Sequence, residues 1–92
     1  MAEARETVEI VNAKGLHARA SAKFVNMVAM LPGGVNVKVL KDGTEAAGGS
    51  ILGLMMLGAA RGDSVDIVVA GDGADQALAR LSGLVKDGFG ED

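Results

Sequence analysis

The chain has 92 residues, of which 49% are hydrophobic and 2% aromatic, and it contains no cysteine and one histidine. Its length predicts one small domain, residues 1–92, with an aliphatic core and little depth for a large ligand pocket. Without cysteine there is no disulfide framework and no thiolate metal site, and a single histidine argues against structural zinc. The net charge of −3 and the shortage of stacking aromatics argue against nucleic-acid binding.

Nothing in the sequence predicts a membrane protein. No apolar run approaches the roughly 18 to 20 residues that cross a bilayer. The N-terminal segment Met1–Glu6 is polar and carries acidic residues, unlike a secretory signal. We therefore expect a soluble, cytoplasmic monomer that holds neither a metal nor another cofactor.

The charges are unevenly distributed along the chain. No acidic residue lies between Ile10 and Lys41, and that segment carries five basic side chains, namely Lys14, Arg19, Lys23, Lys38 and Lys41. It is expected to create a locally positive potential on an otherwise acidic protein. Such a potential attracts a phosphoryl group or an acidic partner surface.

The first part of the chain predicts a strand, a loop and a helix. Thr7–Val11 alternates and is rich in β-branched residues, with Val8 and Ile10 facing inward. A loop containing Gly15 breaks the strand. The helix starts at Ala18 and ends before Pro32, and its apolar face consists of Ala20, Phe24, Met27, Val28 and Leu31.

The middle of the chain predicts a hairpin and a short helix. Val35–Val39 alternates as a second strand, and the Asp-Gly pair that follows is a strong hairpin signal before the return strand Thr44–Ala47. Ile51–Leu57 reads as a short helix with Ser50 as its N-cap, and Gly58 is suited to close it in a left-handed conformation.

The last part predicts one more strand and one more helix. Ser64–Ala70 is apolar enough to be central in a sheet. The final helix, ending near Lys86, has an apolar face made of Ala74, Ala77, Leu78, Leu81, Leu84 and Val85. We expect Phe89 to fold back on the sheet and the terminal pair Glu91-Asp92 to fray.

The resulting order is βαββαβα, without repeats or linkers. The hairpin implies antiparallel pairing, and the amphipathic helices must cover a sheet with one apolar face. The sequence therefore predicts an α+β two-layer sandwich, with a four-stranded antiparallel sheet and three helices on one of its faces.

The single histidine, His17, stands at the start of the first predicted helix. The first-turn N–H groups of a helix are unpaired and form an anion site that the helix dipole reinforces. An imidazole nitrogen placed there is able to attack a phosphoryl group and hold it covalently. Arg19 provides a planar guanidinium that suits phosphate oxygens. On spacing alone, however, such a histidine is more often a capping or surface residue.

Two motifs resemble those of a known family. The run Gly15-Leu16-His17-Ala18-Arg19, followed by Lys23-Phe24-Val25, closely resembles the phosphorylation site of HPr, the histidine phosphocarrier of the bacterial phosphotransferase system. Gly49–Gly58 is similar to the second motif of that family, and Arg61–Asp63 is similar to its next turn. The resemblance covers about Arg5 to about Phe89. Within the family, Glu45, Leu54–Leu57 and Gly88–Asp92 look most like the nitrogen-related branch, often called NPr.

The resemblance implies a phosphocarrier that is itself phosphorylated and is not an enzyme. His17 would accept a phosphoryl group from phosphorylated enzyme I, in the family on the Nδ1 atom, and donate it to an enzyme IIA domain. Arg19 would sit beside the phosphohistidine and assist transfer. Ser50 would correspond to the serine that a dedicated kinase phosphorylates in some bacteria. The resemblance therefore implies enzyme I, an enzyme IIA and, in some bacteria, a serine kinase as partners.

Two positions depart from the family pattern. The usual proline after the arginine is Ala20 here, which removes the pre-set φ of the first helical turn. We expect a change in rate or rigidity and no loss of function. The lysine that often precedes the regulatory serine is Gly49, which weakens the case for a kinase at Ser50; an N-cap is the simpler role for this serine.

The short helix is too apolar to be buried on every side. Roughly half of its six large apolar side chains must be exposed, and an exposed apolar patch usually marks a contact surface. Methionine adapts to several partners. We expect a docking surface beside the histidine loop that includes Ala20, Leu52, Met55 and Met56.

Two other functions remain open on the residues. The first is a regulatory docking module whose phosphorylation state at His17, together with Ser50, controls partner binding. The second, more distant, is a nucleic-acid binder that uses the basic segment. The sequence also leaves open whether the acceptor serves sugar uptake or nitrogen regulation.

Overall fold

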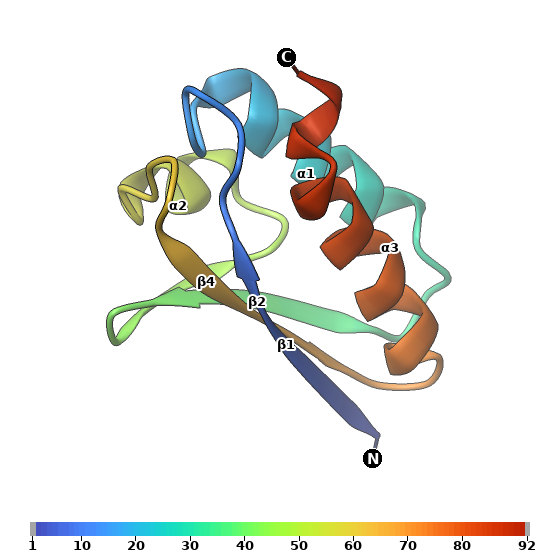
Figure 1. Cartoon of the computed structure of the whole chain (residues 1–92). Coiled ribbons are helices and arrows are strands. Elements are labelled where there is room, and N and C mark those ends of the chain that lie inside the picture. Colours follow the sequence, from blue (N-terminus) through green and yellow to red (C-terminus); the bar gives the residue numbers. More distant parts are fainter. Residues whose placement is uncertain (1, 92) are drawn as a thin grey trace.

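The alternation of apolar and polar residues in the strands decides which face of the sheet is covered. The computed structural model describes residues 2–91. Figure 1 shows the helices on one face of the sheet, with the other face bare. The elements in chain order are β1 (Glu3–Glu9), α1 (Ala18–Met30), β2 (Asn36–Lys41), β3 (Thr44–Ala47), α2 (Ile51–Met56), β4 (Ser64–Ala70), α3 (Ala74–Lys86) and the 3-10 turn η1 (Gly88–Gly90).

The sheet has the strand order β1-β4-β2-β3, and every neighbouring pair is antiparallel. Strand β4 lies between β1 and β2, as its apolar sequence predicted, and Val65, Ile67 and Val69 are buried beneath the helices. The predicted α+β sandwich with the order βαββαβα is therefore confirmed.

The first strand is longer at its start and shorter at its end than predicted. It was expected over Thr7–Val11 and extends over Glu3–Glu9, pairing residue by residue with the whole of β4 from Glu3 opposite Ala70 to Glu9 opposite Ser64. The hydrogen-bonded ladder between β1 and the central strand β4 sets these bounds. Local β propensity does not reveal this pairing.

The other elements follow the sequence closely. Asp42 and Gly43 both have positive φ, as the two-residue hairpin turn between β2 and β3 requires. The Ser50 side chain accepts a hydrogen bond from the Gly53 N–H at 2.9 Å, so its role as the N-cap of α2 is confirmed. Helix α1 starts at Ala18 as predicted, and α3 ends at Lys86, where its end was expected.

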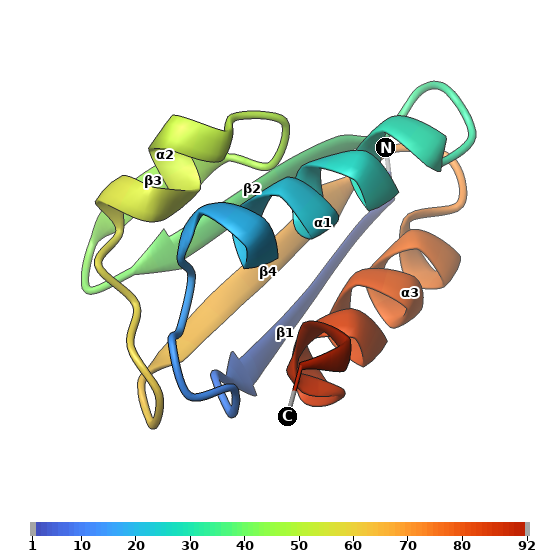
Figure 2. The ribbon, with the colours of Figure 1, turned by 90° about the horizontal axis from the view of Figure 1, so that it is seen from above.

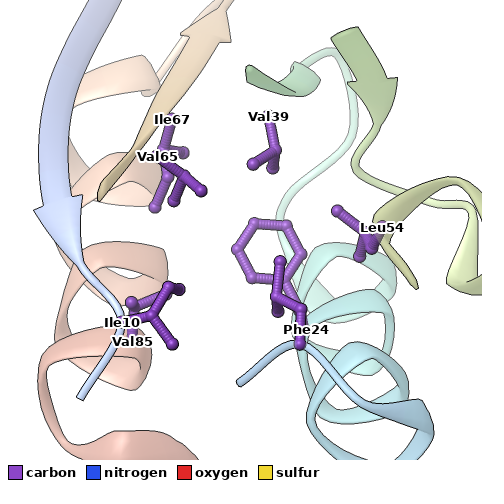
Figure 3. A pocket seen from close by; sticks show the side chains of 8 residues that line it. Ile10, Phe24, Val39, Leu54, Val65, Ile67 and Val85 are labelled. Carbon is purple, nitrogen blue, oxygen red and sulfur yellow. The ribbon is translucent and has the colours of Figure 1, made fainter. Parts of the chain in front are cut away.

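The core is made of aliphatic side chains around Phe24, which is 2% exposed. Figure 3 shows its ring between the sheet residues Val39, Val65 and Ile67 and the helical Leu54. An apolar void of about 10 Å³ remains beside it, roughly the space of one water-sized sphere. Because that void is apolar and so small, the core offers no ligand cavity.

Gly15 holds the loop before α1 against the loop between α2 and β4. Its φ is +64°, and a Cβ at this position would collide with the Ala59 carbonyl oxygen and lie 2.9 Å from the Cα of Ala60. The next residue, Leu16, donates its N–H to the same oxygen of Ala59 at 2.9 Å. Figure 2 shows the two loops at the same end of the molecule. Gly15 thereby sets the position at which α1 begins and at which His17 lies.

We expect Gly15→Ala to destabilise the protein more than Gly58→Ala. Gly58 has nearly the same φ, +65°, but nothing within 4 Å of a Cβ. Both variants suffer the left-handed strain of about 1–2 kcal/mol, and only Gly15→Ala adds overpacking, which costs about 1–3 kcal/mol more. Urea unfolding of both variants measures the difference, and equal losses would contradict the close-approach role of Gly15.

Candidate functional site

His17 forms the N-cap of α1, so its ring and the helix terminus form one unit. Its backbone is extended (φ −75°, ψ −178°), and its Nδ1 atom accepts a hydrogen bond from the Arg19 N–H at 3.3 Å. One of the first-turn N–H groups predicted to be unpaired is thus used by the histidine itself. Its side chain is 21% exposed, so the ring remains open to a partner on one side.

The second ring nitrogen faces a carboxylate from the far end of the chain. His17 Nε2 lies 2.7 Å from Glu91 Oε2. A carboxylate accepts hydrogen bonds and has no proton to donate, and Nδ1 is already an acceptor. The neutral ring therefore carries its proton on Nε2, which donates to Glu91, and keeps the Nδ1 lone pair at the helix terminus.

Glu91 is itself held by Asn12. The Asn12 amide nitrogen donates to Glu91 Oε1 at 3.1 Å and to the Gly15 carbonyl at 2.8 Å. Asn12 is 3% exposed, so its amide is fixed beneath the histidine loop. Asn12 thus joins the loop before α1 to the C-terminal segment.

A left-handed turn brings the C-terminal segment to His17. Gly88, Phe89 and Gly90 have φ values of 64°, 58° and 71°. Positive φ is strained for phenylalanine, but its side chain is 1% exposed, and η1 packs against both α1 and α3. The Lys23 ammonium adds a hydrogen bond to the Phe89 carbonyl at 2.7 Å.

The expectation that the terminal pair frays is wrong for Glu91, and Asp92 lies outside the described residues. Sequence reasoning missed Glu91 because its partner His17 lies 74 positions away. The one available signal was Phe89, a large apolar residue between two glycines just after a helix. The phenylalanine is buried in the core cluster, and the turn that carries it lies against α1 and α3.

The electrostatics around His17 differ from the predicted acid-free surface. Burial by itself would raise the pKa of the Glu91 carboxyl, but hydrogen bonds from Asn12 and His17 and the nearby charge of Arg19 outweigh it, so the pKa is lowered from 4.5. Lys38 and Lys41 of the basic segment are engaged in β2, where Lys38 pairs with Glu45 and Lys41 pairs with Asp42 and Asp63. The site therefore combines cations with one held carboxylate.

Arg19 is exposed, and within residues 2–91 no ion pair involves its guanidinium. No acidic residue occupies the first turn of α1. The helix terminus and the guanidinium therefore favour an incoming anion beside Nδ1.

The placement of Ala20 as a docking residue is wrong. Its side chain is completely buried, because the apolar face of α1 turns it into the core, so a partner cannot contact it. Ser21 is also fully buried and donates its hydroxyl to the Leu16 carbonyl at 3.2 Å, as a structural first-turn serine.

The apolar residues of α2 divide as predicted between core and surface. Leu54 and Leu57 are buried, while Leu52, Met55 and Met56 are 68%, 40% and 75% exposed. Ile51, which was not singled out, is 40% exposed. Since α1 and α2 pack together, this apolar surface adjoins the helix whose N-cap is His17.

The described residues give little support for a metal site or a membrane-spanning helix. Within the described part of the chain, no three His, Asp or Glu side chains are grouped as metal ligands, and no helix is long and apolar enough to cross a membrane. A groove of about 280 Å³ lies between the end of α1 and the start of α3, away from His17.

Comparison with known proteins agrees with this geometry. A family model described as "PTS HPr component phosphorylation site" matches residues 4–87. Phosphocarrier protein HPr of Neisseria meningitidis is 38% identical over 95% of this chain and 96% of its own. Phosphocarrier protein NPr of Escherichia coli is 35% identical over 96% of this chain and 97% of its own. The crystal structure of HPr-C-His from Thermoanaerobacter tengcongensis superposes with a TM-score of 0.87 at 36% identity, covering 100% of this chain and 99% of that one.

The fold and a histidine at a helix terminus define a small phosphocarrier, and the chain belongs to the HPr family. Its function is that of a phosphocarrier of the phosphotransferase system, which carries a phosphoryl group and is not itself an enzyme. Membership of the family implies enzyme I and an enzyme IIA as partners. Relatives named HPr and NPr match at similar identity, so the comparison leaves the branch open.

The pairing of Glu91 with His17 should depend on pH. Because the pKa of Glu91 is lowered in the folded state, its contribution to stability is present above 4.5 and is lost as the pH falls through the lowered value. The free energies of unfolding of the wild type and Glu91→Gln should therefore differ near pH 6 and converge in acid. A difference that grows below pH 4.5 would contradict this sign.

Proposed function

We propose that His17 is the phosphorylated residue and that its Nδ1 atom is the nucleophile. The distinction between the two ring nitrogens carries this proposal. Nδ1 holds the lone pair at the anion-attracting end of α1, while Nε2 holds the proton against Glu91. In the transfer, the Nδ1 lone pair forms the bond to phosphorus. The bond that joins the phosphoryl group to enzyme I breaks, and its electron pair stays with enzyme I.

The groups around Nδ1 suit the phosphorylated state. Once Nδ1 is bonded to phosphorus it no longer accepts a hydrogen bond, so the Arg19 N–H becomes available to a phosphoryl oxygen. The exposed Arg19 guanidinium adds a charge-assisted contact, and the dipole of α1 favours the anion. Neither contact requires the fold to move. Release to an enzyme IIA then reverses the same step.

His17→Ala should abolish phosphorylation. The wild type, incubated with enzyme I and phosphoenolpyruvate, should gain an acid-labile phosphate, as expected of a phosphohistidine, and His17→Ala should gain none. Ser50→Ala is a suitable control, since it removes another nucleophilic side chain of the proposed sites and should keep the label. Acid-labile phosphate on folded His17→Ala would refute the assignment.

We further propose that enzyme I and the enzyme IIA dock on the apolar surface formed by Leu52, Met55 and Met56. The exposure of these side chains and the packing of α2 against α1 support it. A small domain whose core holds only a void of about 10 Å³ is recognised through its surface. Exposed methionine adapts to partners of different shape, as two successive partners require.

Met56→Lys should weaken docking of enzyme I, whereas Met30→Lys should not. The two methionines are matched, being 75% and 76% exposed, but Met30 lies at the other end of α1. A charge in a desolvated contact should weaken the complex about tenfold or more. Titration calorimetry with enzyme I measures the effect. Equal affinities for both variants would place docking elsewhere.

We also propose that the protein belongs to the nitrogen-related branch and acts in the cytoplasm. Glu45, Leu54–Leu57 and the C-terminal Gly88–Asp92 support the branch, and the NPr of Escherichia coli is among the relatives. The labelled protein from the phosphorylation assay should pass its phosphate faster to an enzyme IIA of the nitrogen branch than to one of sugar uptake. The opposite preference would assign it to sugar uptake.

A further inference from the structure

We propose that Glu91 is a positioning residue for phosphoryl transfer. Its carboxylate accepts the Nε2 proton of His17 and fixes the ring so that Nδ1 is presented as the nucleophile. This inference rests on His17 being the phosphorylated residue. Nothing in the sequence around His17 supplies an acid for this purpose, because Ile10–Lys41 contains none.

The ring is held at both nitrogens. The Arg19 N–H contacts Nδ1 at 3.3 Å and Glu91 Oε2 contacts Nε2 at 2.7 Å. The contact at Nε2 is the shorter of the two and is the one that persists after Nδ1 becomes bonded to phosphorus. Rotation of the ring about its bond to Cβ would break it. Glu91 therefore maintains the orientation of the imidazole before and after transfer.

The carboxylate is anchored independently of the ring. Asn12 donates to its other oxygen at 3.1 Å, and the segment before it is fixed by the buried Phe89 and by the Lys23 hydrogen bond to the Phe89 carbonyl. Holding the acceptor in place beforehand removes the entropy of ordering it during the reaction. The tail thus remains attached without the contact between Glu91 and His17.

Charge gives the carboxylate a second role in the reaction. When Nδ1 forms its bond to phosphorus while Nε2 keeps its proton, the ring acquires a positive charge. Glu91 lies against the nitrogen that carries that proton and compensates this charge, as a buried acid does for the imidazolium of a catalytic triad. The proton stays on Nε2 in both directions of transfer, so no base has to remove it.

The test compares Glu91→Gln and Glu91→Ala with the wild type. Glutamine keeps the size of the side chain and removes its charge, and alanine removes both the charge and the hydrogen bond. Glu45→Gln is the matched control, because this exposed glutamate pairs with Lys38 at 3.7 Å on the outer face of the sheet. The measurements are the initial rate of phosphoryl acceptance from phosphorylated enzyme I and the nitrogen-15 spectrum of the unphosphorylated His17 ring.

We expect Glu91→Gln to accept phosphate about tenfold more slowly, because a neutral amide oxygen replaces the charged acceptor of the Nε2 hydrogen bond. Glu91→Ala should be slower still, and Glu45→Gln should match the wild type. In the ring spectrum, the Nε2 proton should exchange slowly with water in the wild type and rapidly in Glu91→Ala. A purely structural role of the tail would leave that proton unchanged.

Two outcomes separate this inference from the function on which it rests. Rates of both Glu91 variants within twofold of the wild type, with the phosphate on His17, would overturn the role of Glu91 alone. A wild-type protein that gains no phosphate on His17 would overturn the proposed function, and the role of Glu91 with it. Slow acceptance in Glu91→Gln, with the fold and the Phe89 signals intact, supports the inference.

Discussion

The imidazole of His17 is held between a backbone N–H of its own helix and a carboxylate from the other end of the chain, and the site depends on both contacts. In an isolated neutral imidazole, either nitrogen can carry the proton and the other then carries the lone pair. Here the two environments differ, since one nitrogen meets a donor and the other an acceptor. A ring with a defined lone pair at a helix terminus is chemically prepared for a phosphoryl group before any partner arrives.

Much of the fold serves to bring these two contacts together. The close approach of Gly15 to Ala59 fixes the position of the loop from which α1 begins. The left-handed turn at Gly88–Gly90 directs Glu91 back toward that point, and burial of Phe89 offsets the strain of its positive φ. The loop before α1 and the C-terminal segment therefore build one site.

The absence of a ligand cavity in the core is consistent with the function of a carrier. In the proposed mechanism the phosphoryl group is held covalently on His17 at the surface, so the protein needs no pocket to retain it. The exposed apolar side of α2 lies beside the helix that carries the histidine. Because Ala20 is buried, the proposed docking surface is limited to the exposed residues of α2.

The sequence by itself determined the order of elements, the central strand, the N-cap at Ser50 and the apolar exposure of α2, because each follows from local periodicity or from a cap within three residues. It also singled out His17 and Arg19 through their motif. The same helical period placed Ala20 on the apolar face of α1, where it is buried. Only the tertiary structure decided the length of β1 and the place of Glu91. Both depend on how distant segments pack, through cross-strand pairing in β1 and a contact across 74 positions for Glu91, which no local pattern records.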